Sequence, residues 1–303
     1  MRQNSQATPM NESRTFVDAQ VHIHACFPLH KFFDAACVNF AAQAYEHDLT
    51  QFGGVLLLVE SQGNDWFSWL TKMADEGEAI RNGSWEAWTI HRTKEQCSLI
   101  LRSSRGDDLV VIAGRQIITK GQVIVSALLT ETVFPDGGKL ATTVDAIRKS
   151  GGLPMVLWGA SKWSGEQGKK LSEFLQSQKP EEIFLGDHGS RHTFLPYPEP
   201  FLQAEQQGIR ILPGSDPLPL RADYVRPGSA GFSIAAELCQ DTPAEDLKRF
   251  LQDSTVKTIP YYAPETLLRF TKNFLARRKF ENEGRAQHAA TRSRQYQPVR
   301  ARS

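Results

Sequence analysis

The stretch Asp18-Ala-Gln-Val-His22-Ile-His24 joins a short apolar segment to two histidines that stand one residue apart. Alternate residues of a β-strand point the same way, so both imidazoles would project together from the carboxyl end of a strand. Much later in the chain, Gly208-Ile-Arg-Ile-Leu-Pro-Gly-Ser-Asp216 has the pattern of a second buried strand, and it stops at a carboxylate. One such strand end early and one late predict an α/β barrel with a metal at its mouth.

Composition narrows the class of protein. The 303 residues accommodate one large α/β domain or two small ones, and 40% hydrophobic residues suffice for a sizeable core. A net charge of +1 argues against strong binding of nucleic acid over the body of the protein. No apolar run approaches the roughly 20 residues of a membrane-spanning helix, and residues 1–14 lack the apolar core of a secretory signal. The cysteines show no CxxC spacing, so we expect a reduced, cytoplasmic protein; they are Cys26, Cys37, Cys97 and Cys239.

Strand and helix patterns alternate along most of the chain, which predicts parallel strands joined by right-handed crossovers. Strands are expected at 15–23, 53–60, 109–118, 123–129, 153–157, 182–185 and 209–213. Helices are expected at 31–48, after Asn64, at 142–149, 165–178 and 199–207, after Thr242, and at 264–280. The expected fold is a (β/α)7-type, distorted TIM-like barrel over residues 15–280, with a β-hairpin inserted at about 84–103. Residues 1–14 are expected to be flexible, and the basic tail 281–303 disordered.

The ends of the predicted strands gather chemically active side chains, and function in parallel α/β folds lies at that edge. We expect a divalent zinc, manganese or iron ion, because imidazole and carboxylate ligands suit these metals. Such a metal would activate a water molecule for hydrolysis. The candidate ligands are His22, His24, Glu60 and Asp216.

The remaining strand ends offer groups for proton transfer and for binding an anion. Asp187 or His188 would relay a proton. A phosphate or carboxylate of the substrate would be bound by the cations, with a tryptophan lining the pocket; these residues are Arg115, Lys162, Arg191 and Trp158. Purely structural interpretations stay open. The two histidines can be polar residues on one strand face, and Asp216 can cap a helix.

In the order of these motifs the chain resembles the PHP (polymerase and histidinol phosphatase) family of metal-dependent hydrolases. The His22-Ile-His24 strand is similar to the family's first motif, and Gly214-Ser215-Asp216 to its last. The resemblance implies a seven-stranded barrel, up to three metals and cleavage of phosphate esters. It is incomplete, because Gln116, Trp158 and Leu218 stand where the family has ligands. The resemblance therefore implies one metal or none, and the amidohydrolase barrels are the nearest competitor.

The resulting functional hypothesis is a PHP-like hydrolase that acts at a mononuclear metal site on a small anionic molecule, such as a phosphorylated one. The alternative is a catalytically silent protein of the same kind, which binds a ligand or a partner. We expect no membrane span and at most a weak contact of the basic tail with nucleic acid or anionic lipid. The oligomeric state is left open.

Overall fold

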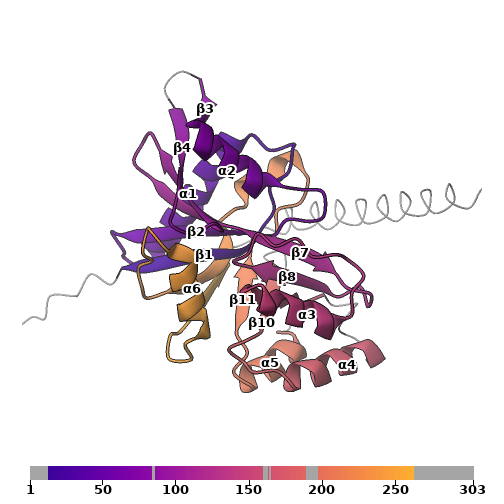
Figure 1. Ribbon diagram of the computed structural model, residues 1–303. Coiled ribbons are helices and arrows are strands. Elements are labelled where there is room, and N and C mark those ends of the chain that lie inside the picture. The colour runs from indigo at the N-terminus through magenta and orange to yellow at the C-terminus, as the bar shows by residue number, and fades with distance from the viewer. Residues whose placement is uncertain (1–12, 84–85, 160–162, 164, 189–196, 263–303) are drawn as a thin grey trace, which may run out of the picture. The chain divides into compact units, whose positions relative to one another are not determined.

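The computed structural model describes residues 13–83, 86–159, 163, 165–188 and 197–262 (Figure 1). All of these belong to one compact unit, residues 1–263, while a second unit, residues 264–303, lies outside the described residues. The helix expected at 264–280 and the tail expected at 281–303 therefore fall outside the described part.

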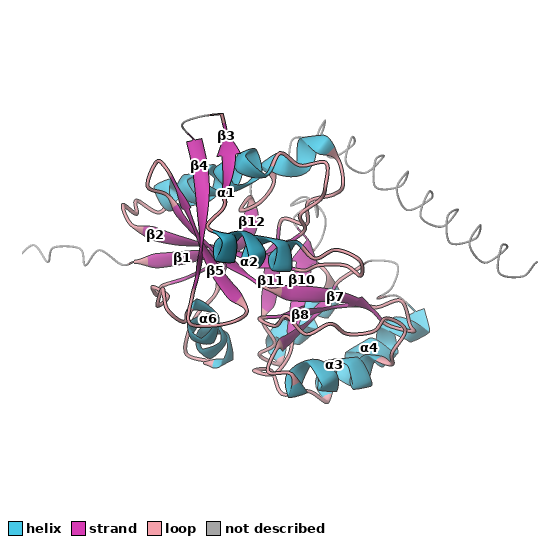
Figure 2. Ribbon diagram, turned by 45° about the horizontal axis from the view of Figure 1, so that its top comes forward, coloured by secondary structure: helices cyan, strands magenta, loops and turns pink. Residues whose placement is uncertain are grey.

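The larger sheet is mixed and has eight strands (Figure 2). β1 runs parallel to β2, and β2 runs parallel to β6, with Val17 opposite Val55 and Val55 opposite Val110. Every other neighbouring pair in this sheet is antiparallel. The order across the sheet is β13 (Ile259–Tyr262), β12 (Ala230–Ile234), β1 (Arg14–Val21), β2 (Phe52–Leu58), β6 (Asp108–Ile112), β5 (Ser98–Ser103), β4 (Glu86–Arg92) and β3 (Ala79–Asn82).

The smaller sheet has five strands, and it is also mixed. Its parallel part is β9, β10 and β11, whereas β7 with β8 and β8 with β9 pair antiparallel. Only Ala113 separates β6 from β7, so the chain passes directly from the larger sheet into the smaller one. The order is β11 (Ile211–Gly214), β10 (Phe184–His188), β9 (Leu153–Leu157), β8 (Ile124–Leu128) and β7 (Gly114–Ile118).

Helices α1 to α5 cover the outer faces of the two sheets, whereas α6 packs with residues of both sheets. Because side chains alternate along a strand, neighbouring residues of one strand belong to different hydrophobic cores. In β2, Leu56 and Leu58 pack with the apolar residues of α1 (Leu29–Glu46) and α2 (Trp66–Glu76). Val55 and Leu57 face the other way, toward the smaller sheet and α6 (Pro243–Gln252). The far face of the smaller sheet packs against α3 (Leu140–Lys149), α4 (Gly165–Gln176) and α5 (Glu199–Gln206). A short 3-10 helix spans Arg221–Val225.

The predicted barrel was wrong, because the strands of the described residues form two mixed sheets and no closed ring. Strands β3 to β5 extend the larger sheet beyond β6, and the antiparallel strands β12 and β13 extend it beyond β1. These additions occupy the edges that a closed barrel would have joined. The two sheets nevertheless contact each other: an isolated bridge pairs Glu60 with Arg115, and the amide of Asp216 donates a 2.9 Å hydrogen bond to the carbonyl of Gln20.

Most individual elements lie close to their predicted positions. The strand at 153–157 is confirmed residue for residue as β9, and the hairpin expected at 85–91 and 97–102 is the antiparallel pair β4 and β5. The strand expected at 109–118 is broken at Ala113 into β6 and β7. Thr242 is the N-cap residue of α6 but makes no side-chain cap. The Glu95 carboxylate accepts hydrogen bonds from the amides of Ala244 and Glu245 in its place.

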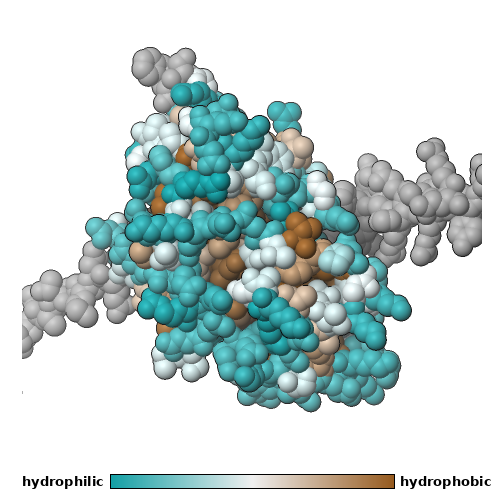
Figure 3. All heavy atoms as spheres, viewed as in Figure 1, coloured by the Kyte–Doolittle hydropathy of each residue, from teal (hydrophilic) through white to brown (hydrophobic). Residues whose placement is uncertain are grey.

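The surface seen in Figure 3 is mostly hydrophilic, with apolar side chains showing mainly in the middle of that face. Among the described residues, no helix is both long and apolar enough to cross a membrane. All four cysteines are free thiols, as their spacing predicts.

Candidate functional site

The candidate site forms where β1 and β11 end and approach each other. Gly214 makes this approach possible, because a Cβ at that position would lie 2.3 Å from the backbone nitrogen of Gln20. Beyond Gly214 the chain turns sharply, and Asp216 has a positive φ of 46°. A non-glycine residue in this left-handed region is strained, so the surrounding structure must hold it there.

Two buried charged side chains hold the Ser215 peptide that precedes this turn. The Asp18 carboxylate accepts hydrogen bonds from the amides of Ser215 and Gly228, each at 2.8 Å. The Arg226 guanidinium donates to the Ser215 carbonyl from Nε at 3.1 Å and from Nη2 at 2.8 Å. Burial raises the pKa of Asp18 to about 6, although its hydrogen bonds act in the opposite direction. Both hydrogen-bonding groups of Ser215's backbone are thereby fixed, which orients Asp216.

His22 and Asp216 form an imidazole–carboxylate pair. His22 Nε2 lies 3.6 Å from Asp216 Oδ1, and each residue is only 9% exposed. Burial lowers the pKa of His22, while the Asp216 carboxylate and a hydrogen bond with Gln116 act to raise it. The imidazole is therefore neutral at neutral pH and next to a carboxylate that would stabilise its protonated form.

His24 makes a different contact. Its Nε2 lies 3.0 Å from the carbonyl oxygen of Pro217 and is therefore the protonated ring nitrogen, because a carbonyl only accepts. The His24 ring stacks near His22, with 6.0 Å between the ring centroids, and meets Phe27 edge-on. Burial lowers the pKa of His24 as well.

Glu60 belongs to a separate buried ion pair. Its Oε2 lies 3.4 Å from Arg115 Nη1, and the backbone amides of Trp66 and Phe67 donate hydrogen bonds to its carboxylate. Arg115 also contacts the Asp65 carboxylate at 2.8 Å. Burial raises the pKa of Glu60, opposed chiefly by Arg115. The Glu60 carboxylate thus stabilises the start of α2 and, through Arg115, the contact between the two sheets.

The predicted metal centre of His22, His24, Glu60 and Asp216 is not assembled. Among the residues that the structure describes, no group of three or more His, Cys, Asp or Glu side chains is placed to hold a metal ion. The Nε2 atom of His24 is committed to a carbonyl, and Glu60 to Arg115 and two amides. With Nε2 protonated, His24 could ligate a metal only through Nδ1. The four predicted ligands do not form one cluster among the described residues, and the metal ion stays a prediction.

The other predicted site residues are spread over several places. Asp187, fully buried in β10, accepts a 2.8 Å hydrogen bond from the Tyr262 hydroxyl. Trp158 follows β9, and its ring packs 5.8 Å from that of Phe201 on α5. Lys162 and Arg191 lie outside the described residues, as does the side chain of His188. Their roles, and the proton relay through Asp187 or His188, stay predictions.

Sequence reasoning missed two residues that shape the site. The sequence does point to Asp18, because a single carboxylate within the apolar run of β1 destabilises the fold unless it is hydrogen-bonded. No sequence pattern points to Arg226, since it follows a short 3-10 helix that hydrophobic periodicity does not predict.

Comparison with known proteins adds little to this geometry. No family model matches the chain, and no curated protein matches it. Among solved structures, the crystal structure of PsfC from Pseudomonas syringae PB-5123 gives a TM-score of 0.49 at 12% identity, covering 88% of this chain and 99% of that one.

Proposed function

We propose that the protein is a hydrolase whose proton-transfer pair is His22 and Asp216, acting on a small anionic substrate. The observation that supports it is the 3.6 Å approach of a buried imidazole to a carboxylate on a strained turn. Strained backbone and perturbed pKa values tend to gather at functional sites. The similarity of the His22 and Asp216 segments to PHP motifs is part of the same proposal.

The chemistry available to this pair is general acid–base catalysis. Neutral His22 would accept a proton from a water molecule as the water oxygen bonds to the electrophilic phosphorus or carbon of the substrate. Asp216 would stabilise the resulting imidazolium, and this proton would then pass to the leaving-group oxygen as its bond breaks. Groups in this role typically contribute about 10²- to 10⁴-fold to the rate. A low pKa suits His22 as the base, because it keeps the imidazole unprotonated near pH 7.

One observation favours the binding-module alternative. The carboxylates of Asp18 and Glu60 are both engaged with backbone amides, so they stabilise the fold and have little capacity left for chemistry. A protein in which such carboxylates serve only the fold would bind a ligand without turnover.

An activity screen separates the two functions. Aryl phosphates, anionic aryl esters and neutral aryl esters are offered to the full-length protein with chelator and, separately, with added manganese or zinc. We expect His22→Gln to lower the rate for the anionic class by about 10²-fold or more. The control is His91→Gln, which alters an exposed histidine on β4 and should leave the rate unchanged. Full activity in His22→Gln contradicts the proposed base, and no hydrolysis of any class favours the binding module.

A further inference from the structure

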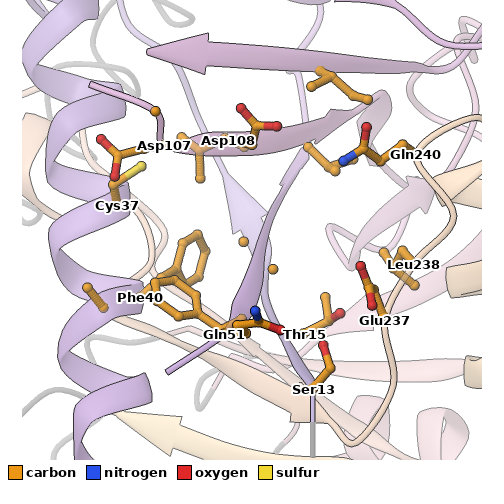
Figure 4. Close-up of a pocket in the computed structure, with 18 of the residues that line it drawn as sticks. Ser13, Thr15, Cys37, Phe40, Gln51, Asp107, Asp108, Glu237, Leu238 and Gln240 are labelled. Atoms are coloured by element: carbon orange, nitrogen blue, oxygen red, sulfur yellow. The ribbon is translucent and has the colours of Figure 1, made fainter. Parts of the chain in front are cut away.

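A concavity lies at the end of the parallel strands opposite to the histidine pair. Figure 4 shows the residues that line it. It forms where β1, β2 and β6 begin, whereas His22 and Asp216 follow the ends of β1 and β11. Its volume is about 550 Å³, within the usual range for small-molecule pockets. This pocket plays no part in the proposed hydrolysis, so its function is independent of that proposal.

Glycines and aromatic residues give the pocket an apolar floor. Gly53 and Gly54 begin β2 without side chains, and a Cβ on Gly54 would come within 2.7 Å of the Phe40 ring and 2.9 Å of Leu109. Phe52, beside them, remains 38% exposed. Phe40 and Leu109 are buried, so the Phe52 ring is the aromatic surface that the pocket leaves open to a bound molecule.

The rim of the pocket is acidic. Asp107 and Asp108 lie on one side and Glu237 on another, and no lysine or arginine is among the lining residues (Figure 4). Asp108 pairs with the neighbouring Arg102 at 3.3 Å. Within the part of the chain that the structure describes, Asp107 and Glu237 form no ion pair, although Asp107 accepts a hydrogen bond from Ser103. Both carboxylates therefore lack a directly paired cation among the described residues, although the charge of Asp107 also acts on the nearby Arg105.

The Cys37 thiol on the pocket wall reports the same electrostatics. Burial raises its pKa to about 12, and the carboxylates of Asp107 and Asp34 add to that rise. Burial disfavours charge of either sign, but the contribution of the two carboxylates reflects a negative potential, which favours a positive charge.

The geometry points to a binding site for a small organic cation, namely a protonated amine on an aromatic or hydrocarbon body. The body would lie against Gly53 and the exposed ring of Phe52, and the ammonium group would face Asp107 and Glu237. Charge complementarity favours a cation over an anion, and the Phe52 ring adds a cation–π attraction. The apolar surface of the pocket favours an amine that carries an aromatic or hydrocarbon group over an inorganic cation.

Calorimetric titration of the full-length protein with benzylamine tests this site, with benzyl alcohol and benzoate as neutral and anionic counterparts. We expect benzylamine to bind at least about tenfold more tightly than benzyl alcohol, and benzoate not to bind. The exposed pair Asp107→Asn/Glu237→Gln should weaken benzylamine binding about tenfold. Glu166→Gln/Glu181→Gln removes two exposed carboxylates away from the lining residues and should leave binding unchanged.

A second variant tests the location without changing any charge. Ala41 is an exposed residue of α1 that lines the pocket, and Ala41→Leu should fill part of the space and weaken benzylamine binding about tenfold. Equal affinity for benzylamine and benzyl alcohol overturns the inference. So does unchanged binding in either pocket variant, or no binding of benzylamine at about 10 mM. Binding of a lysine-containing peptide in place of benzylamine also overturns it, because the site is then for a protein partner.

Discussion

The carboxylate of Asp18 and the amide of Ser215 are joined by a 2.8 Å hydrogen bond across 197 residues of sequence. This bond ties the middle of β1 to the end of β11, and the same carboxylate also holds the Gly228 amide. A buried carboxylate therefore sets the geometry of the turn that carries Asp216. Four predictions follow from the groups around this contact.

Asp18 makes stability depend on pH. Its folded-state pKa of about 6 lies above the ordinary value of 3.8, so the folded state holds this proton more tightly. The stabilisation is fully present below about pH 4 and is lost as pH rises through about 6. A shift of about two pKa units corresponds to about 3 kcal/mol.

Urea unfolding of the wild type and of Asp18→Asn at pH 4 and pH 7 measures this term. The free energy of unfolding of the wild type, minus that of the variant, should fall by about 2 kcal/mol between the two pH values. A difference that does not change with pH, or that increases, contradicts the raised pKa of Asp18.

The imidazole of His22 should titrate below its ordinary pKa of 6.5 because it is buried. Asp216→Asn should lower the pKa further, since it removes the carboxylate that favours the protonated ring. The folded state thus loses stability as pH falls below the ordinary value. NMR titration of the ring signals, assigned with His22→Gln, checks the direction. A pKa that rises in Asp216→Asn would show that the two side chains are not in contact.

Gly214→Ala should destabilise the protein strongly, by about 3 kcal/mol or more, because its Cβ would collide with the Gln20 backbone. Gly121→Ala is the matched control, since a Cβ there has its nearest neighbour, Gln167 Nε2, at 3.9 Å. Thermal unfolding of both variants compares them. Similar midpoints would mean that β1 and β11 do not approach as closely as described.

Arg115→Met should cost about 3 kcal/mol, because it leaves the Glu60 carboxylate buried without its cation. The double variant Glu60→Gln/Arg115→Met should recover part of this loss, as no buried charge remains. Chemical denaturation of wild type, both single variants and the double variant gives the coupling. Additive effects of the two substitutions would argue against the ion pair.

Local patterns predicted the elements well wherever packing follows periodicity. The helix expected after Asn64 buries Phe67, Leu70 and Met73, as its spacing indicates, although Asp65 and not Asn64 is its N-cap residue. Pairing partners were harder to predict. Nothing local distinguishes a strand that pairs parallel, such as β2, from one that pairs antiparallel, such as β8, because both are short apolar runs.

The candidate site, too, was predictable from the sequence only in part. The sequence alone placed His22, His24 and Asp216 at strand ends, since the change from apolar to polar residues is visible in one dimension. It did not reveal that Glu60 binds Arg115 and that His24 binds a carbonyl, because those partners are chosen in space. For this reason the expected ligands do not form one cluster among the described residues, and the metal ion itself stays a prediction.

The sequence by itself determined the strands, the helices and the residues that stand at their ends, because these depend on side-chain periodicity over a few neighbours. The tertiary structure alone decided that the strands form two mixed sheets, and that Asp18 and Arg226 hold the turn before Asp216. The physical reason is that contacts between distant segments determine sheet closure and the pairing of buried charges. A local sequence pattern contains no information about those contacts.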